Sequence, residues 1–177
     1  DYYFSYGNVL YIILNSNNRN AAEHSQLMEK AIKSHPDAKW KVVAFHHDIY
    51  GSGQPHSDFD GANLRTIFAP LMDKYDIDVC LTGHDHSYAR TYQIIDGTAI
   101  DYGEKEAVDP EGTLYIAAGS ASGSKFYNLA TQKQYYIAER SNNQLPTYST
   151  IDFTDSQFTI KTYAVSYTHL RAHETGR

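Results

Sequence analysis

Two histidines separated by a single residue, His84 and His86, stand directly after an apolar segment of the sequence. That segment, residues 77–81, is typical of a buried strand, so it would deliver both imidazoles to a loop at the carboxyl edge of a sheet. Open α/β sheets bind their ligands at that edge. Because neutral imidazole is the commonest metal ligand among side chains, two of them at this spacing could face one small volume. Taken alone, the pair is equally well explained as ordinary loop histidines.

A further histidine, His46, also follows a short β-branched run, residues 41–45. Two strands that carry histidines at the same end are difficult to explain by packing alone. The sequence therefore predicts a metal site where the carboxyl ends of two neighbouring strands meet.

The composition is that of a soluble globular protein of one domain, with 177 residues, 41% hydrophobic and 20% charged. A net charge of −6 without a basic stripe argues against binding to nucleic acid. The longest apolar run, residues 9–14, is far shorter than the roughly 20 residues that cross a bilayer, so membrane insertion is not expected. The single cysteine, Cys80, excludes a disulfide within the chain and is expected to be buried. Nothing in the sequence indicates an oligomeric state.

The elements needed to position these histidines can be traced from the first residues onward. An apolar run at residues 8–14 predicts a central strand. Asn20, with Glu23 three residues later, forms a capping-box pattern that predicts a helix over about 20–34. His24 lies on this helix among polar neighbours and is expected to be a surface histidine.

A second strand, at about 40–46, leads into His46, and a helix capped by Asp60 follows it. Pro70 falls inside that helix and predicts a kink or a break. A third strand, at about 77–82, then precedes the histidine pair. This order of strands and helices predicts a βαβαβ unit and an α/β fold.

The pattern changes after residue 90. Residues 92–95 and 113–118 are typical of strands, and the small residues of 119–124 favour a plain linker between elements. Residues 148–153 and 157–164 alternate polar and apolar side chains around a short turn, which predicts a hairpin.

Both ends of the chain have unusual features. The sequence opens at Asp1 in the middle of a pattern, without an initiator methionine or a signal peptide, so we expect a fragment. Residues 165–175 resemble the translation of a transposase adapter used in sequencing libraries. We therefore expect 165–177 to be a non-native, adapter-derived tail and discount His169 and His173 within it.

The histidine motifs carry a resemblance to a known family. A V-x-x-H segment ending at His46 and the G-H-x-H segment of residues 83–86 occur in the order found in calcineurin-like metallophosphoesterases, and the chain is most similar to their purple acid phosphatase branch. The likeness covers nearly all of residues 1–164. It implies that these residues are part of the catalytic domain, the C-terminal part of a four-layer α/β/β/α sandwich.

The resemblance also implies an activity and a set of site residues. A family member hydrolyses small-molecule phosphate mono- or diesters with water activated by two metal ions, divalent or of the Fe/Zn/Mn type. His46 and His84 would bind one metal and His86 the other. His56 would contact phosphate or protonate the leaving group; the alternative is a solvated loop histidine.

Two neighbours of the predicted ligands have their own expected places. His47 should point to the opposite face of its strand and play a structural role or one that supports the ligands, rather than bind metal. Asp85, between two ligands, is expected to bond to backbone.

The sequence departs from the family where carboxylates should hold the two cations together. The family's D-x-H, G-D-x-x-Y and G-N-H motifs are absent. This chain alone should therefore be a poor catalyst or none. Two alternatives stay open, a non-catalytic binding module that keeps the fold and a mononuclear zinc hydrolase using His46, His84 and His86. Because the branch is often exported, the resemblance also implies an extracytoplasmic or secreted location.

Overall fold

The computed structural model describes residues 1–54, 59–103, 106–165 and 175–176, and within them two sheets and two helices are formed. The larger sheet has the strand order β1-β2-β3-β4-β7-β5-β6, and β8 pairs with β5. Its strands are β1 (Tyr2–Tyr6), β2 (Val9–Ile13), β3 (Trp40–Phe45), β4 (Val79–Thr82), β5 (Tyr88–Ile95), β6 (Thr98–Ile100), β7 (Thr113–Ala118) and β8 (Ile137–Ser141). The smaller sheet contains β9 (Thr147–Phe153), β10 (Phe158–Ala164) and β11 (Thr175–Gly176), and the helices are α1 (Ala21–Ser34) and α2 (Phe59–Lys74).

The predicted βαβαβ unit forms the centre of the larger sheet. Strands β2, β3 and β4 are adjacent and parallel, with α1 and α2 as their connections, and β7 adds a further parallel strand beside β4. Parallel strands need cover on both faces, which explains why these runs are almost continuously apolar. The expected α/β fold is confirmed.

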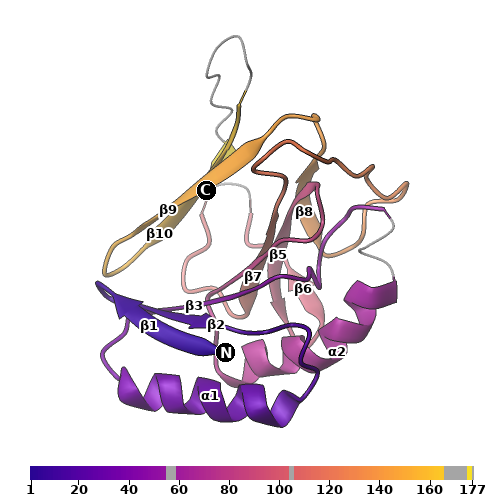
Figure 1. The fold of residues 1–177 in the computed structure, drawn as a ribbon. Coiled ribbons are helices and arrows are strands. Elements are labelled where there is room, and N and C mark those ends of the chain that lie inside the picture. Colours follow the sequence, from indigo (N-terminus) through magenta and orange to yellow (C-terminus); the bar gives the residue numbers. More distant parts are fainter. Residues whose placement is uncertain (55–58, 104–105, 166–174, 177) are drawn as a thin grey trace.

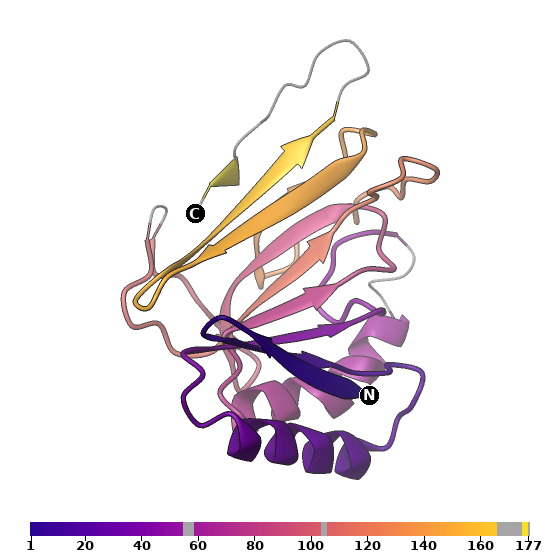
Figure 2. The ribbon, with the colours of Figure 1, turned by 60° about the vertical axis from the view of Figure 1, so that its left-hand side comes forward.

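The molecule has three layers, which Figures 1 and 2 show from two sides. Helices α1 and α2 lie along one face of the larger sheet, where residues such as Met28 and Phe68 are fully buried. The β9–β10 hairpin crosses the other face, and Ile160 packs there on Val42 and Val79. These layers correspond to α/β/β of the predicted α/β/β/α sandwich; the fourth layer is not formed by the residues that the structure describes.

Both helices follow their sequence signals, with two differences in α2. Asn20 caps α1 as predicted, because its side-chain oxygen accepts from the backbone N–H of Ala22 at 3.1 Å and its amide donates to Glu23 at 2.8 Å. Helix α2 begins at Phe59, so Asp60 lies in the first turn rather than at the cap. The helix also continues through Pro70 without a break, because the buried side chains of its inner face hold it against the sheet.

The C-terminal residues are described only in part. The pairing of Thr175–Gly176 with β10 is present, whereas residues 166–174, which include His169 and His173, and residue 177 lie outside the described residues. The assignment of 165–177 as an adapter-derived tail stays a prediction. In the part of the chain that is described, no helix combines the length and the apolar character needed to cross a membrane.

Two side chains with a position expected from the sequence, Cys80 and His24, are buried in the core. Cys80 lies at the centre of β4 with no exposed surface, as expected, and burial raises the pKa of its thiol. His24 was expected at the surface, and that expectation is wrong: the residue is 0% exposed. It shares one helical face with Met28 and Ala31, four and seven residues later, which is the spacing that directs a side chain into a core.

Burial of His24 is made possible by two acceptors and a ring. Nδ1 lies 2.6 Å from the carboxylate of Asp1, Nε2 lies 2.8 Å from the carbonyl oxygen of Asn18, and the ring centroid is 5.1 Å from that of Phe68. Since both partners accept, both ring nitrogens donate when the imidazole is protonated. His24 thus ties the first strand and the loop before α1 to the helical layer.

We predict that His24→Ala lowers the free energy of unfolding by about 2–4 kcal/mol, because it leaves a mostly buried carboxylate without its partner and opens a gap beside Phe68. Urea unfolding followed by circular dichroism measures the change. The matched control is Gln26→Ala, an exposed position on the same helix, with an expected change of at most about 0.5 kcal/mol. Equal effects for the two variants would contradict the role given to His24.

Candidate metal centre

The parallel pairing of β3 with β4 brings the two histidine motifs together. Phe45 is paired with Thr82 at the end of this ladder, so the chains leave the sheet side by side. The contact continues one step further, because the backbone N–H of Gly83 donates to the carbonyl of His46 at 2.9 Å. The predicted meeting of the two strand ends is therefore present.

His84 adopts an unusual backbone conformation at this point. Its φ is +63°, in the left-handed region that residues other than glycine seldom occupy, and the N–H of Asp85 donates to the carbonyl of Gly83 at 2.6 Å across it. Such conformations are costly and occur mostly where function or packing demands them. The turn directs the imidazole of His84 back toward His46, and His84 Nδ1 lies 3.2 Å from His46 Nε2.

The separation of these two nitrogens fits a shared metal ion. Nitrogen ligands bind zinc at about 2.0–2.1 Å, so two nitrogens 3.2 Å apart would subtend about 100° at a common ion, close to tetrahedral. His46 and His84 thus form a suitable pair of ligands. Their assignment to one metal, which the resemblance implies, stays a prediction.

His86 is not part of that close pair, and two neighbours hold its ring. Its Nδ1 lies 3.0 Å from the carbonyl oxygen of Lys125, and its ring centroid is 4.9 Å from that of Tyr127. Because a carbonyl only accepts, Nδ1 carries the proton in the neutral ring and Nε2 keeps its lone pair. Metal-binding histidines commonly donate their second nitrogen to a carbonyl in this way.

The three predicted ligands do not form one cluster. Over residues 1–54, 59–103, 106–165 and 175–176, no group of three or more histidine, cysteine, aspartate or glutamate side chains is arranged to hold a metal. The structure brings His46 and His84 together and places His86 separately. The donors fit part of a metal centre, without the carboxylates that would keep two cations close.

His47 lies beside the candidate pair, and not on the opposite face of the strand as the sequence predicted. Its ring centroid is 4.8 Å from that of His84, and its Nδ1 is 2.8 Å from Ser16 Oγ. The prediction was wrong because β3 ends at Phe45, so the alternation of faces no longer applies. Burial first, and then the charge of His46, lowers the pKa of His47, which favours its neutral form. The structure shows the contact of His47 with Ser16, and a role in supporting the ligands stays a prediction.

Asp85 connects the histidine loop to the loop that leads toward His56. It is 0% exposed, and its carboxylate accepts from the backbone N–H groups of Ser52 at 3.1 Å and Gly53 at 2.6 Å, and from Ser87 Oγ at 2.9 Å. The expected bond from Asp85 to backbone is thus confirmed. His56 itself, with residues 55–58, lies outside the described residues.

Sequence reasoning missed some of the contacts around the candidate ligands. Ser16 follows β2 at the same sheet edge as the histidines, so the rule used for the strand ends could have found it. Lys125 and Tyr127 come from an irregular segment whose approach to His86 has no sequence signal.

We predict that Gly53→Ala disrupts the loop held by Asp85. A Cβ built on Gly53 would stand 1.8 Å from Asp85 Oδ1, far inside contact distance, so the loop or the carboxylate must move. The expected loss is about 1–3 kcal/mol of unfolding free energy in urea titrations.

The double variant Gly53→Ala/Asp85→Ala distinguishes this cause from a general effect of the loop. Asp85→Ala alone leaves two buried N–H groups without their acceptor, but it also removes the obstructing carboxylate. The double variant should therefore lose less stability than the sum of the single variants. Strict additivity would show that the clash is not the reason.

Comparison with known proteins shows which family the chain resembles. Residues 1–88 match the family described as calcineurin-like phosphoesterase. The chain is 28% identical over 112 residues to a phosphoenolpyruvate phosphatase of Allium cepa, covering 62% of this chain and 21% of that protein. It is 27% identical over 96 residues to Fe(3+)-Zn(2+) purple acid phosphatase 12 of Arabidopsis thaliana, covering 50% of this chain and 19% of that protein. The match thus spans about a fifth of the length of these curated relatives.

A solved structure supports the same fold. The purple acid phosphatase PPD1 from seeds of yellow lupin, Lupinus luteus, superposes with a TM-score of 0.79 at 17% identity, covering 98% of this chain and 31% of that one. Residues 1–88 therefore match the calcineurin-like phosphoesterase family, and the chain is similar to the purple acid phosphatase branch of that family.

Proposed function

We propose that this chain contributes to the hydrolysis of phosphate mono- or diesters, as part of a metal-dependent phosphoesterase. The observation that carries the proposal is the 3.2 Å approach of His46 Nε2 to His84 Nδ1 at the shared end of β3 and β4. The match of residues 1–88 to the calcineurin-like phosphoesterase family supports the reaction class.

Each histidine has a role in this proposal. His46 and His84 would hold one ion and His86 a second, with Nε2 of His86 oriented by the carbonyl of Lys125. His56 would contact the phosphate or supply a proton to the leaving alkoxide, which is otherwise a poor leaving group. Two bound cations would supply Lewis acidity to the phosphoryl oxygens and lower the pKa of the attacking water.

The remaining groups of the metal centre are proposed to come from a longer protein. Neutral imidazoles bring no negative charge, so carboxylates are needed to hold two cations close to one another. Since the match spans about a fifth of the length of the relatives, a complete enzyme has room for them. The isolated chain is then a poor catalyst. The extracytoplasmic or secreted location and the identity of the metals stay predictions.

A mononuclear zinc hydrolase is the second candidate. It is supported by the close approach of His46 and His84, two of the three imidazoles that it would use, whereas the separate place of His86 weighs against it. Three nitrogen ligands and one open position would suit that chemistry. The number of ions bound by the active protein separates the candidates, two for the phosphoesterase and one for the zinc hydrolase.

We predict weak binding of Co²⁺ to the isolated chain, visible as new d–d absorption. His84→Ala should weaken this binding about tenfold or more, because one nitrogen of the close pair is lost. His35→Ala is the matched control, since that histidine caps the far end of α1, and it should leave the titration unchanged. If the His84→Ala variant binds Co²⁺ with the same affinity as the unaltered chain, His84 is not a ligand of the site.

Activity requires the complete enzyme, so its test begins by sequencing the source DNA upstream of Asp1. A frame that continues into D-x-H, G-D-x-x-Y and G-N-H motifs should encode a protein that hydrolyses p-nitrophenyl phosphate, and His84→Ala in it should abolish turnover while the circular dichroism spectrum stays the same. A start codon directly before Asp1 without those motifs would overturn the enzyme proposal and leave a binding module.

A further inference from the structure

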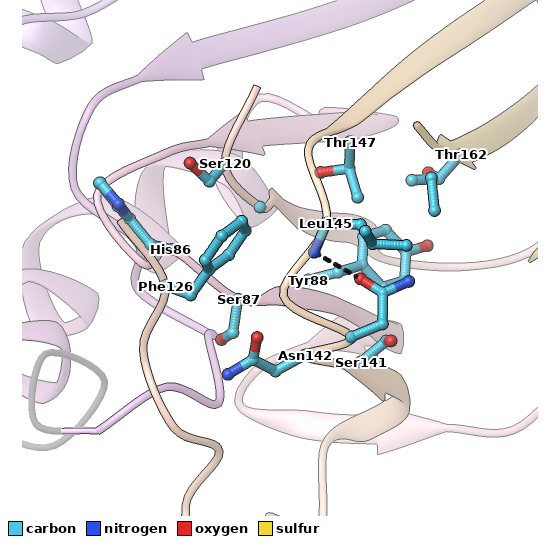
Figure 3. Close-up of a pocket in the computed structure, with 13 residues that line it drawn as sticks. His86, Ser87, Tyr88, Ser120, Phe126, Ser141, Asn142, Leu145, Thr147 and Thr162 are labelled. Carbon is cyan, nitrogen blue, oxygen red and sulfur yellow. Dashed lines mark hydrogen bonds between the residues drawn. The ribbon is translucent and has the colours of Figure 1, made fainter. Parts of the chain in front are cut away.

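A cavity of about 280 Å³ lies beside His86 and is drawn in Figure 3. Its walls come from segments far apart in the sequence: the loop that carries the histidines, the loop after β7, the loop after β8, and one end of the β9–β10 hairpin. In the view of Figure 3, the Phe126 ring lies between His86 and Leu145. The cavity therefore begins at a predicted metal ligand and extends toward the smaller sheet.

No acidic or basic side chain other than His86 lines the cavity. None of its thirteen residues is a lysine, arginine, aspartate or glutamate. Arg140, next to the lining residue Ser141, is engaged elsewhere, because its guanidinium donates to Ser52 Oγ at 3.1 Å and to the carbonyl of Ala130 at 2.8 Å. The Nζ of Lys125 lies over the Tyr127 ring, 4.9 Å from its centroid. A ligand with further charges would find no counter-ion among the lining side chains.

Some polar groups of the lining serve the structure of the walls. The Asn142 amide donates to the carbonyl of Tyr127, and Asn143 Oδ1 accepts from the backbone N–H of Leu145 at 3.3 Å. Thr147 Oγ1 donates to the carbonyl of Ala118 at 2.9 Å. These bonds hold the loops after β7 and β8 against the hairpin, so the cavity is built by the fold.

Other polar groups are available to a ligand. Among the described residues, no hydrogen bond engages the hydroxyl groups of Ser120 and Ser141 or the amide nitrogen of Asn143. Two hydroxyls, one amide donor and the ring face of Phe126 are therefore presented to one small volume. Neutral donors and acceptors around an aromatic ring suit a small ring that carries hydroxyl groups.

We propose that this cavity binds the alcohol portion of the substrate, and that this portion is a small, neutral, hydroxylated ring such as a sugar. The assignment rests on the proposed phosphoesterase function, because His86 then places the phosphate at the mouth of the cavity. The ring stacks on Phe126, and its hydroxyls bond to Ser120, Ser141 and Asn143. The preferred substrate class is a phosphate ester of a neutral sugar or cyclic polyol rather than of an alcohol bearing more charge.

The test uses the full 177-residue chain without metal and follows its ¹H–¹⁵N NMR spectrum during addition of glucose. Saturable shifts are expected at the amides of Ser120, Phe126 and Asn143. Gluconate, of similar size but negatively charged, should bind at least fivefold more weakly. Absence of saturable shifts at these amides, or equal binding of the two probes, would overturn the proposal.

Variants give the second arm of the experiment. Phe126→Ala should weaken glucose binding at least fivefold, whereas Phe59→Ala, which truncates a phenylalanine that is 79% exposed at the start of α2, should not change it. If Phe126→Ala fails to fold, Ser141→Ala replaces it and should weaken binding at least twofold. Unchanged binding in the folded variant would remove the cavity as the sugar site.

The outcomes are separable from those of the proposed function, because the glucose titration needs no metal. Cobalt binding through His84 without glucose binding would leave the phosphoesterase proposal standing and overturn the sugar assignment. If glucose binds and cobalt does not, the proposed function is overturned. The cavity is then a sugar site that does not receive the alcohol portion of a phosphate ester.

Discussion

The pairing of β3 with β4 is the constraint on which the candidate centre depends. Both strands run in the same direction, so their ends coincide, and the bond from Gly83 N–H to the carbonyl of His46 extends the pairing beyond the sheet. A slip by one residue would move His46 away from His84, and in the strand that slips it would exchange the side chains that face the helices with those that face the hairpin. The register that packs the core is therefore the register that brings the imidazoles together.

Two buried polar side chains, Asp85 and His24, link separate elements of this structure through hydrogen bonds. Asp85 holds the loop before α2 through two backbone N–H groups, and His24 holds the first strand and the loop before α1 through Asp1 and Asn18. Neither contact binds a ligand. Each replaces lost hydration with hydrogen bonds of good geometry, which is the condition for burying charge inside a protein. Buried polar contacts thus help to hold the loops near the candidate centre, beside the apolar packing of residues such as Ile49.

Much of this architecture could be predicted because its signals are local. The run before His46, the Asn20 capping box and the alternation of the β9–β10 hairpin each specify an element within a few residues. The first strand was missed, although a Gly-Asn turn at Gly7 joins it to β2. The burial of His24 was also missed. Its polar neighbours in the sequence favour a surface position, whereas its four-residue spacing to Met28 indicates the buried face of the helix.

The environment of the site was less predictable, since it is assembled from distant segments. The contact of Lys125 with His86 joins residues 39 positions apart, and no short pattern encodes it. The end of β3 at Phe45, one residue before the strand was expected to end, was enough to place His47 beside His84. Strand-end rules identify which residues reach an edge, whereas the direction of each side chain there follows from tertiary contacts.

The burial of Cys80 has a practical consequence for spectroscopy. Its thiol is enclosed in the centre of β4, and its raised pKa keeps it protonated, so alkylating reagents have neither access to it nor a thiolate to attack. A cysteine introduced at an exposed position would be the one reactive thiol of the chain. A fluorophore or spin label could then be attached at a chosen site while the native residue is retained.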